Sequence, residues 1–238
     1  MKPFVLGAVF ARGGSKGVPG KNLRLIGGRP LVAHAVIAAT SVPTISRLIV
    51  STDDEAIRRA AVEAGAEAPF TRPADLATDN APEWLAWRHA LIECERLGFG
   101  DGRIHTLVSV PATAPLRRIE DVAAAIAKLH AGGFDLVLSV TPSRRSPYFN
   151  MVVEEDGAVR VVIPQPGDGP MRRQDTPPTF DIATVVYAAR RDYVVEAPGL
   201  FAGRVGSIVV PEESAVDIDT EFDLEMAAWL WARRERRS

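Results

Sequence analysis

The chain has 238 residues, 28 basic and 30 acidic side chains with a net charge of −2, and a hydrophobic fraction of 47%. These values are ordinary for a globular protein that buries a large core as one large domain or two small ones. The near-neutral balance argues against a nucleic-acid binder that works through bulk charge, and a single cysteine excludes an internal disulfide framework.

The N-terminal apolar run, Phe4 to Ala11, ends at Arg12. It is too short for a membrane span and has the wrong flanks for a signal peptide, so we interpret it as a buried first strand. With the single cysteine, this predicts a soluble cytoplasmic protein that has neither nucleic acid nor membrane as a partner.

Apolar runs of strand length alternate with longer segments of helical period over the first 140 residues. Strands are predicted at 4–10, 47–51, 104–110 and 135–140, and helices at 29–40, 54–64, 83–97 and 119–130. Repeated alternation of strand and helix predicts a largely parallel sheet that is covered by helices on both faces.

The alternation of predicted strands and helices stops after residue 140. Residues 150–162 carry two short apolar stretches around Glu155-Asp156-Gly157, which predicts a hairpin. Residues 164–178 are rich in proline, glycine and charge, which predicts an exposed loop that needs support from elsewhere, such as a second subunit. Two more strands and a final helix are predicted at 182–188, 204–210 and 220–236.

The strongest functional signal is the segment from Phe10 to Asn22, which holds four glycines, one serine and three cations. Glycines let the backbone turn and bring N–H groups close to an anion. The spacing is neither GxGxxG nor that of a P-loop, because Lys21 is followed by asparagine and Ser15 replaces the first glycine. Its place after the first strand predicts a triphosphate site, with a mobile surface loop as the alternative.

This loop and the blocks that follow it resemble the acylneuraminate cytidylyltransferase family, the CMP–sialic acid synthetases and their relatives. The further matching blocks, in the family's order, are Val50–Asp54, Arg72–Ala77, Pro115–Arg117, Arg172–Asp175 and Val216–Thr220. The resemblance implies a Rossmann-like nucleotide-diphospho-sugar transferase fold of the GT-A-like type. Such a fold is an α/β three-layer sandwich with a mainly parallel sheet.

The resemblance also implies an activity. In this family a hydroxyl of an acidic nine-carbon sugar attacks the α-phosphate of CTP, diphosphate leaves, and Mg²⁺ is required. We therefore expect CMP transfer from CTP to an acidic acceptor, a nonulosonic or related α-keto acid sugar. Residues 1–238 would form a single cytidylyltransferase domain, and residues 141–178 would form an arm that packs on the second subunit of a homodimer.

The expected nucleotide-binding residues lie in the glycine loop and at one later position. They are Ala11, Arg12, Gly13, Gly14, Ser15, Lys16, Lys21, Asn22 and Arg72. Arg12 and Lys21 are also expected to be catalytic, because they would neutralise charge that grows on diphosphate. Asn22 would anchor either the loop or a phosphate oxygen.

Base recognition is left open in two respects. Arg72 falls where the family contacts the cytosine ring, and an ordinary surface arginine is the alternative. Pro82-Glu83 occupy a place where family members often carry small hydroxylated residues near the base. The choice of CTP over another nucleoside triphosphate therefore rests on the resemblance alone.

Asp217 and Asp219 are the expected catalytic metal ligands. Because they are two apart, their carboxylates face one way in an extended segment, and Mg²⁺ binds one or two carboxylates together with phosphates and waters. The alternative is that Asp219 helps to cap the last helix and Asp217 makes a surface salt bridge. Asp53 and Asp54 would contact the nucleotide or a second metal, or else cap the following helix.

The acceptor side departs most from the family pattern. Pro111 replaces a glutamine that binds the sugar, and Asp181 is an acid where a sialate carboxylate would be unwelcome. We therefore expect a different acceptor, bound by residues that include Asp181 and the group Arg172, Arg173 and Gln174. Arg144 and Arg145 either bind a further anionic group of the acceptor or form a solvent-exposed basic surface.

Three alternative functions stay open from the residues alone. One is the same transfer to a phosphonate or another small acidic acceptor, and a second is the same fold with another nucleotide. The third is a non-catalytic sensor that binds CTP. Away from the site, His34, Cys94 and the helical tryptophans Trp84, Trp87 and Trp229 are predicted to be packing residues.

Overall fold

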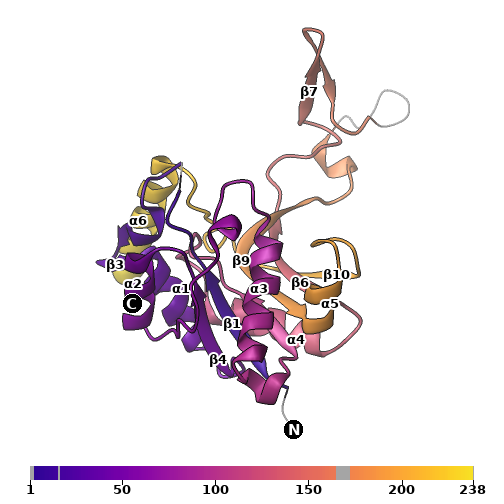
Figure 1. Ribbon diagram of the computed structural model, residues 1–238. Helices are drawn as coiled ribbons and strands as arrows, with labels where there is room; N and C mark the ends of the chain where they lie inside the picture. Colours follow the sequence, from indigo (N-terminus) through magenta and orange to yellow (C-terminus); the bar gives the residue numbers. More distant parts are fainter. Residues whose placement is uncertain (1–2, 16, 165–171, 238) are drawn as a thin grey trace.

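The computed structural model describes residues 3–15, 17–164 and 172–237, and the side chain of Arg173 lies outside this set. Within these ranges six strands form one sheet in the order β10-β6-β9-β5-β1-β4 (Figure 1). Its strands are β1 (Val5–Phe10), β4 (Arg47–Ser51), β5 (Thr106–Ser109), β6 (Leu136–Pro142), β9 (Phe180–Arg190) and β10 (Val205–Val209). All the predicted strands of the sheet are therefore confirmed.

The helices around the sheet are α1 (Leu31–Thr40), α2 (Glu55–Glu63), α3 (Glu83–Arg96), α4 (Ile119–His130), α5 (Arg191–Glu196) and α6 (Glu221–Glu235). Of these, α5 is short and was not predicted. The small elements are β2 (Leu25–Ile26), β3 (Arg29–Pro30), β7 (Val152–Glu155), β8 (Ala158–Val161), η1 (Lys21–Leu23), η2 (Ala74–Leu76), η3 (Phe99–Gly102) and η4 (Arg173–Asp175).

The strand directions decide where the loops gather. β1 pairs in parallel with both β4 and β5, and β10 pairs in parallel with β6. β9 lies antiparallel between β5 and β6, so all the other strands point the same way. The expected mainly parallel sheet is confirmed, and the carboxyl ends of five strands meet at one edge, where ligands bind in open α/β sheets.

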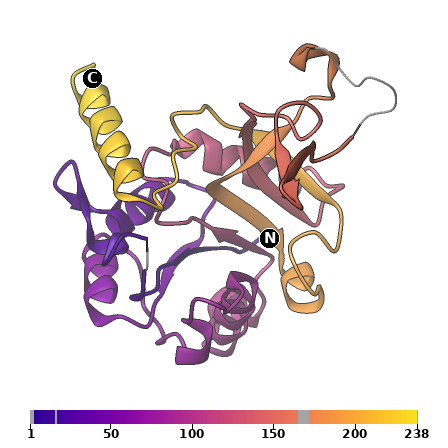
Figure 2. The same cartoon turned by 90° about the horizontal axis from the view of Figure 1, so that it is seen from above.

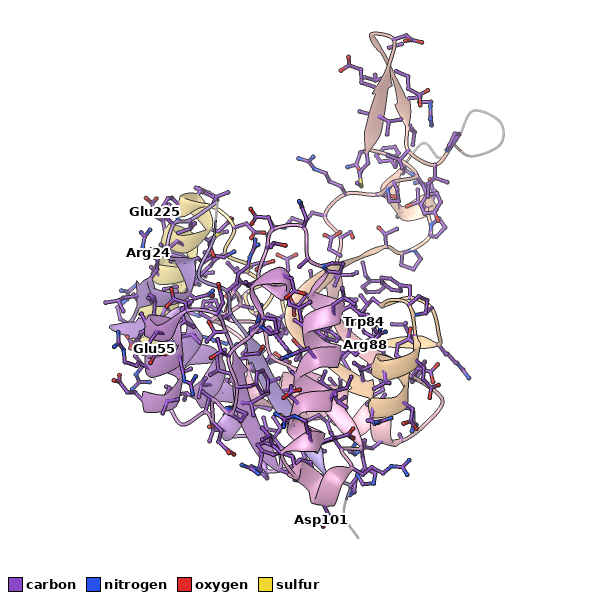
Figure 3. All side chains as sticks on the ribbon, viewed as in Figure 1. Arg24, Glu55, Trp84, Arg88, Asp101 and Glu225 are labelled. Carbon is purple, nitrogen blue, oxygen red and sulfur yellow. The ribbon has the colours of Figure 1, made fainter. Side chains whose placement is uncertain are left out.

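Helices cover both faces of this sheet, as Figure 2 shows from above. In β1, alternate side chains face opposite sides: Val5 and Val9 join a core with α1, α2 and α4, whereas Leu6, Ala8 and Phe10 join a core with α3 and α5. Trp84 and Arg88 of α3 (Figure 3) both donate to the carbonyl oxygen of Ala197, just beyond α5, at 3.0 and 2.6 Å.

The predicted hairpin is formed by β7 and β8 and projects away from the body of the molecule (Figure 1). Its two-residue turn is Asp156-Gly157, and both residues have positive φ, 53° and 77°. This is the turn that matches the twist of antiparallel strands. In the predicted proline-rich loop, 164–178, residues 165–171 lie outside the described ranges.

Predictions about packing are confirmed with one exception. His34 and Cys94 are buried, and burial raises the pKa of the Cys94 thiol to about 12, which leaves it inert. Trp84 and Trp87 are buried, but Trp229 is 57% exposed on the outer side of α6, so its predicted packing role is wrong. None of the helices in the described ranges is both long and apolar enough to cross a membrane.

Candidate active site

A cavity of about 640 Å³ opens at the carboxyl edge of the sheet, between the glycine loop and the segment that leads into α3. It collects residues that lie far apart in the chain. Predicted site residues in its lining are Arg12, Ser15, Lys21, Asn22, Arg72 and Asp219. Lys16 lies outside the described residues, so its predicted role stays a prediction.

The glycine loop is held to the sheet by its own backbone. The amide of Ala11 donates to the carbonyl of Ser51 in β4 at 3.2 Å, and the amide of Gly13 donates to Asp53 Oδ1 at 3.0 Å. Buried Asn22 donates from Nδ2 to the carbonyl of Arg12 at 2.9 Å, which closes the loop on itself. Asn22 was expected to anchor either the loop or a phosphate oxygen, and this contact shows that it anchors the loop.

Two cations of the loop are oriented by carboxylates. Arg12 Nη2 lies 2.6 Å from Asp79 Oδ1, a residue that sequence reasoning missed because nothing near it in the chain marks it. Lys21 Nζ donates to the carbonyl of Ile218 at 2.6 Å and to Asp219 Oδ1 at 3.0 Å. An ammonium group has three donors, so Lys21 keeps one N–H for a ligand in the cavity.

Gly17 shows how closely the loop approaches the Asp217–Asp219 segment. A Cβ atom at this position would lie 2.2 Å from the backbone carbonyl oxygen of Asp219, and a backbone atom cannot yield as a flexible side chain can. The close contact explains why glycine occupies this place. By comparison, Gly14 has nothing within 4 Å of its ideal Cβ, so its backbone is open to the solvent side.

Arg72 is buried, with 5% of its surface exposed, so the surface-arginine alternative is wrong. Its Nε donates to Ser51 Oγ at 3.2 Å and its Nη2 donates to the carbonyl of the same residue. Its guanidinium carbon lies 5.7 Å from the centre of the Phe10 ring. Burial lowers the pKa of Arg72, and the charge of Glu83 opposes that shift.

Asp217 and Asp219 flank Ile218, which is fully buried and whose amide donates to the carbonyl of Thr113 at 3.0 Å. The Oδ1 atom of Asp217 is buried and has no hydrogen-bond partner among the described residues. Burial raises the pKa of Asp217, and the charge of Asp219 raises it further. A buried carboxylate oxygen without a partner beside a second carboxylate fits the hard oxygen set that Mg²⁺ prefers.

The alternatives for the other acids are resolved by their contacts. Asp54 caps α2, because its Oδ1 accepts from the amides of Ala56 and Ile57 at 2.8 and 2.9 Å. The α6 cap is made by Thr220 and Asp223 in a reciprocal capping box. Asp219 adds only its backbone amide to Asp223 there, at 3.2 Å, so its carboxylate is not used for capping.

Arg117 is a buried cation beneath the site, and it belongs to the short matching block Pro115–Arg117. Its Nε donates to the carbonyl of Val185 in β9 at 3.2 Å, and its Nη2 donates to the carbonyl of Pro111. Burial lowers the pKa of Arg117 to about 9, and the charge of Asp217 opposes the shift. Arg117 therefore ties β9 to the loop after β5 and places a positive charge near the carboxylate pair.

The acceptor-side candidates are not gathered in one place. Arg172 is exposed on the arm and pairs with Asp175 at 3.1 Å, and Gln174 lines a separate cavity near Pro142. Arg173 has no described side chain. Among the candidates whose side chains the structure describes, only Asp181 lines a cavity with Asp217, and its Oδ1 accepts from Ser143 Oγ at 2.6 Å.

A second cavity, of about 490 Å³, also borders the Asp217–Asp219 segment and shares no lining residue with the first. Asp217 and Asp181 line it, whereas Asp219 lines the first cavity, so the two carboxylates do not line one cavity, contrary to the expectation that they face one way. Arg144 and Arg145 also line it. Arg144 Nη2 pairs with Glu212 at 2.7 Å in the same wall, so both signs of charge face this space.

Cations grouped with Asp219 in a cavity at the open edge of this sheet suit the transfer of a nucleotidyl group, and the chain is accordingly a nucleotidyltransferase. Residues 6–204 match the family model described as cytidylyltransferase. The chain belongs to this cytidylyltransferase family. The expected family resemblance is thereby confirmed, and the non-catalytic sensor is set aside.

Individual relatives agree with the family. The chain is 33% identical over 226 residues to the CMP-N,N'-diacetyllegionaminic acid synthase of Campylobacter jejuni, which covers 95% of this chain and 94% of that protein. It is 32% identical, with the same coverage, to the post-translational flagellin modification protein B of Campylobacter coli. A solved CMP:2-keto-3-deoxy-manno-octonic acid synthetase in complex with CTP has a TM-score of 0.69 at 19% identity and covers 97% of this chain and 99% of its own. The expected fold class is confirmed.

Proposed function

We propose that this cytidylyltransferase transfers CMP from CTP to an acidic sugar, a nonulosonic or related α-keto acid sugar, and releases diphosphate. The observation that carries the proposal is that the Asp217–Asp219 segment contributes to the lining of two separate cavities. The cavity on the Asp219 side holds the cations that suit a triphosphate. The cavity on the Asp217 side holds Arg144 and Arg145, which suit the carboxylate of an acceptor.

In this arrangement the acceptor hydroxyl attacks the α-phosphorus, a new P–O bond forms, and the bond to the β-phosphate breaks. Lys21 and Arg12 lie on the nucleotide side, where they would hold the departing diphosphate and neutralise its charge. Asn22 keeps the loop closed through the carbonyl of Arg12, so that the loop amides stay oriented toward the phosphates. Positioning of the two substrates supplies most of the remaining rate enhancement.

Asp217 and Asp219 would hold Mg²⁺ in this site, where the ion supplies charge neutralisation for the phosphates when it is bound. The described residues contain no group of three or more His, Cys, Asp or Glu side chains that could hold a metal. Two carboxylates complemented by substrate phosphates and waters are the coordination that Mg²⁺ commonly adopts. The same proposal has the enzyme act in the cytoplasm, in keeping with its one buried thiol.

The acceptor is tested by measuring diphosphate release from CTP and Mg²⁺ with a panel of acids. The panel contains N,N'-diacetyllegionaminic acid, other nonulosonic acids, a shorter keto-deoxy sugar acid and a phosphonate. We expect release with at least one nonulosonic acid, and we expect the first compound to be among them because of the relative that shares 33% identity. Release with the phosphonate alone would contradict the proposed acceptor class.

We further propose that residues 1–238 act as one catalytic domain with an arm, 141–178, that joins two copies as a homodimer. An isolated two-stranded hairpin is marginally stable in water, so the projecting β7–β8 hairpin needs a surface to pack on. Val152 and Val161 pair directly across the hairpin, and Val159 lies on the same face two residues from Val161. Val152 and Val159 are 56% and 67% exposed, which leaves this valine-rich face, with Glu154 opposite Val159, for a second copy.

Replacement of Val152 and Val159 by aspartate is expected to convert the dimer into a monomer, because it places charges in the middle of the valine-rich face. Light scattering coupled to gel filtration measures the change. Phe201→Asp is the matched control, since Phe201 is similarly exposed, at 64%, but lies on the body of the molecule. An unchanged mass for the double variant would contradict the role of the arm.

A further inference from the structure

Glu83 is an acidic residue of the nucleotide cavity that the proposed chemistry does not use. It is the first residue of α3 and lines the cavity together with Arg72 and Phe10. Its Oε1 accepts a hydrogen bond from Trp87 Nε1 at 2.8 Å, one turn further along the helix. The carboxylate is therefore turned toward a fixed donor instead of being free in solvent.

The Trp87 ring that orients Glu83 is itself immobilised. It is 4% exposed and packs against Phe10, Trp84 and Tyr187, with ring centres 6.2, 5.4 and 5.4 Å away. A side chain locked by packing holds its hydrogen-bond partner in one geometry. This aromatic cluster makes the Glu83 carboxylate a preorganised acceptor in the wall of the cavity.

Glu83 and Arg72 form a complementary acceptor and donor in the same wall. Surrounding protein desolvates Glu83 and raises its pKa, although part of the residue's surface is exposed, and the charge of Arg72 opposes the shift. Arg72 uses Nε and Nη2 on Ser51. The two groups make no direct hydrogen bond or ion pair within the described residues, so each is available to a ligand.

The bases of nucleotides differ in how they would meet this pair. Cytosine presents an exocyclic amine, which donates, next to ring acceptors, whereas uracil presents a carbonyl oxygen in place of the amine. We propose that Glu83 selects the base of the nucleotide, with its carboxylate accepting from the cytosine amine while the Arg72 guanidinium donates to the ring acceptors. UTP would place an oxygen against the carboxylate and leave both without a donor.

A simpler role for Glu83 is an acid that stabilises the start of a helix, as acids in a first turn often do. Glu55 provides this comparison, because it is the first residue of α2 and lies on the outside of the molecule, away from the cavity (Figure 3). Glu83 differs from Glu55 in its tryptophan partner and in its place in the cavity. These two features are what a base-reading role requires and a helix-stabilising role does not.

The test is the binding of CTP and of UTP, each with Mg²⁺ and without acceptor, measured by calorimetry. We expect the wild-type protein to prefer CTP by about 10- to 100-fold. In Glu83→Gln the preference is expected to fall close to one, because an amide offers either a donor or an acceptor after rotation. Trp87→Phe, which removes the orienting N–H, is expected to give an intermediate preference.

Glu55→Gln is the matched control and is expected to keep the wild-type preference. An unfolded fraction of any variant lowers the binding stoichiometry and leaves both dissociation constants unchanged, so loss of fold does not imitate loss of selectivity. A Glu83→Gln protein with the wild-type ratio of CTP to UTP affinity would overturn the inference. The inference about Glu83 rests on the proposed function only in placing CTP in this cavity. If no acid sugar served as an acceptor, the proposed function would be contradicted, but the measured preference for CTP over UTP would still test Glu83.

Discussion

Replacing Lys21 with alanine is expected to lower kcat by about 10²- to 10³-fold, the usual cost of removing one donor that stabilises developing negative charge. The Lys21 side chain is 14% exposed and lies against the segment that precedes α6. Its ammonium donates to the carbonyl of Ile218 and to the carboxylate of Asp219, which leaves one N–H for a phosphate. Diphosphate release from CTP with a saturating acceptor measures the change.

Lys128→Ala is the control for the Lys21 variant. Lys128 Nζ also donates to a backbone carbonyl, that of Ser207, at 2.6 Å, but it lies on α4 away from the cavity. This variant is expected to keep the wild-type rate. Circular dichroism and thermal unfolding establish that both variants are folded. A Lys21→Ala enzyme with near wild-type kcat would contradict the proposed role of the ammonium in the reaction.

Asp217→Asn is expected to lower kcat by about 10²-fold or more, because it weakens the metal site that neutralises the phosphates. The same change removes a carboxylate whose buried Oδ1 has no partner in the described part of the chain. Mg²⁺ with CTP stabilises a protein that binds both, so it is expected to raise the Tm of the wild type. The Tm of Asp217→Asn is expected to rise much less.

Without metal, Asp217→Asn is expected to be more stable than the wild type at neutral pH, by about 1 kcal/mol. Burial raises the pKa of Asp217 in the folded state above its unfolded value. The folded protein therefore holds the proton more tightly, and the free energy of unfolding falls as pH rises from the unfolded pKa through the raised folded pKa. Asparagine does not titrate, so the free energy of unfolding of the Asp217→Asn variant does not fall over this pH range for this reason.

Urea unfolding at a series of pH values that begins at about pH 3, below the ordinary pKa of an aspartate, measures the difference in pH dependence. Asp101→Asn is the control, since Asp101 is an exposed residue of η3 (Figure 3) and lines neither of the cavities beside the carboxylate pair. It is expected to change neither kcat nor the effect of Mg²⁺ on the Tm. If Asp217→Asn kept the full Mg²⁺-dependent rise in Tm, Asp217 would not be a ligand.

The glycine loop was identifiable because its chemistry is local. Four glycines and three cations within a short segment mark an anion site whatever surrounds them. The Asp217 and Asp219 spacing carries the same kind of local signal. Each pattern predicted the kind of group to be bound, and the cavity does contain Arg12, Lys21 and Asp219 together.

Other parts of the site had no local mark. Asp79, which pairs with Arg12, looks like an ordinary surface acid in the sequence. Glu83 was noted only as a departure from the family pattern near the base, and nothing in the chain placed it in one cavity with Arg72. Arg117 lies in a short block that gives no sign of its burial. Arg172 had a stronger motif than any of these, yet it pairs with Asp175 on the arm and does not line either cavity at the carboxylate pair.

The amino-acid pattern was sufficient for the strands of the sheet, for the α-helices around it other than α5, and for the class of ligand, because periodicity and short motifs act between neighbours in the chain. It was not sufficient for the pairing of Lys21 with Asp219, which are 198 residues apart. That contact exists because β1 and β10 run in the same direction and bring their carboxyl ends to one edge of the sheet. Strand order and direction, which result from packing of the whole core, decide which distant charges meet and which side chains line one cavity.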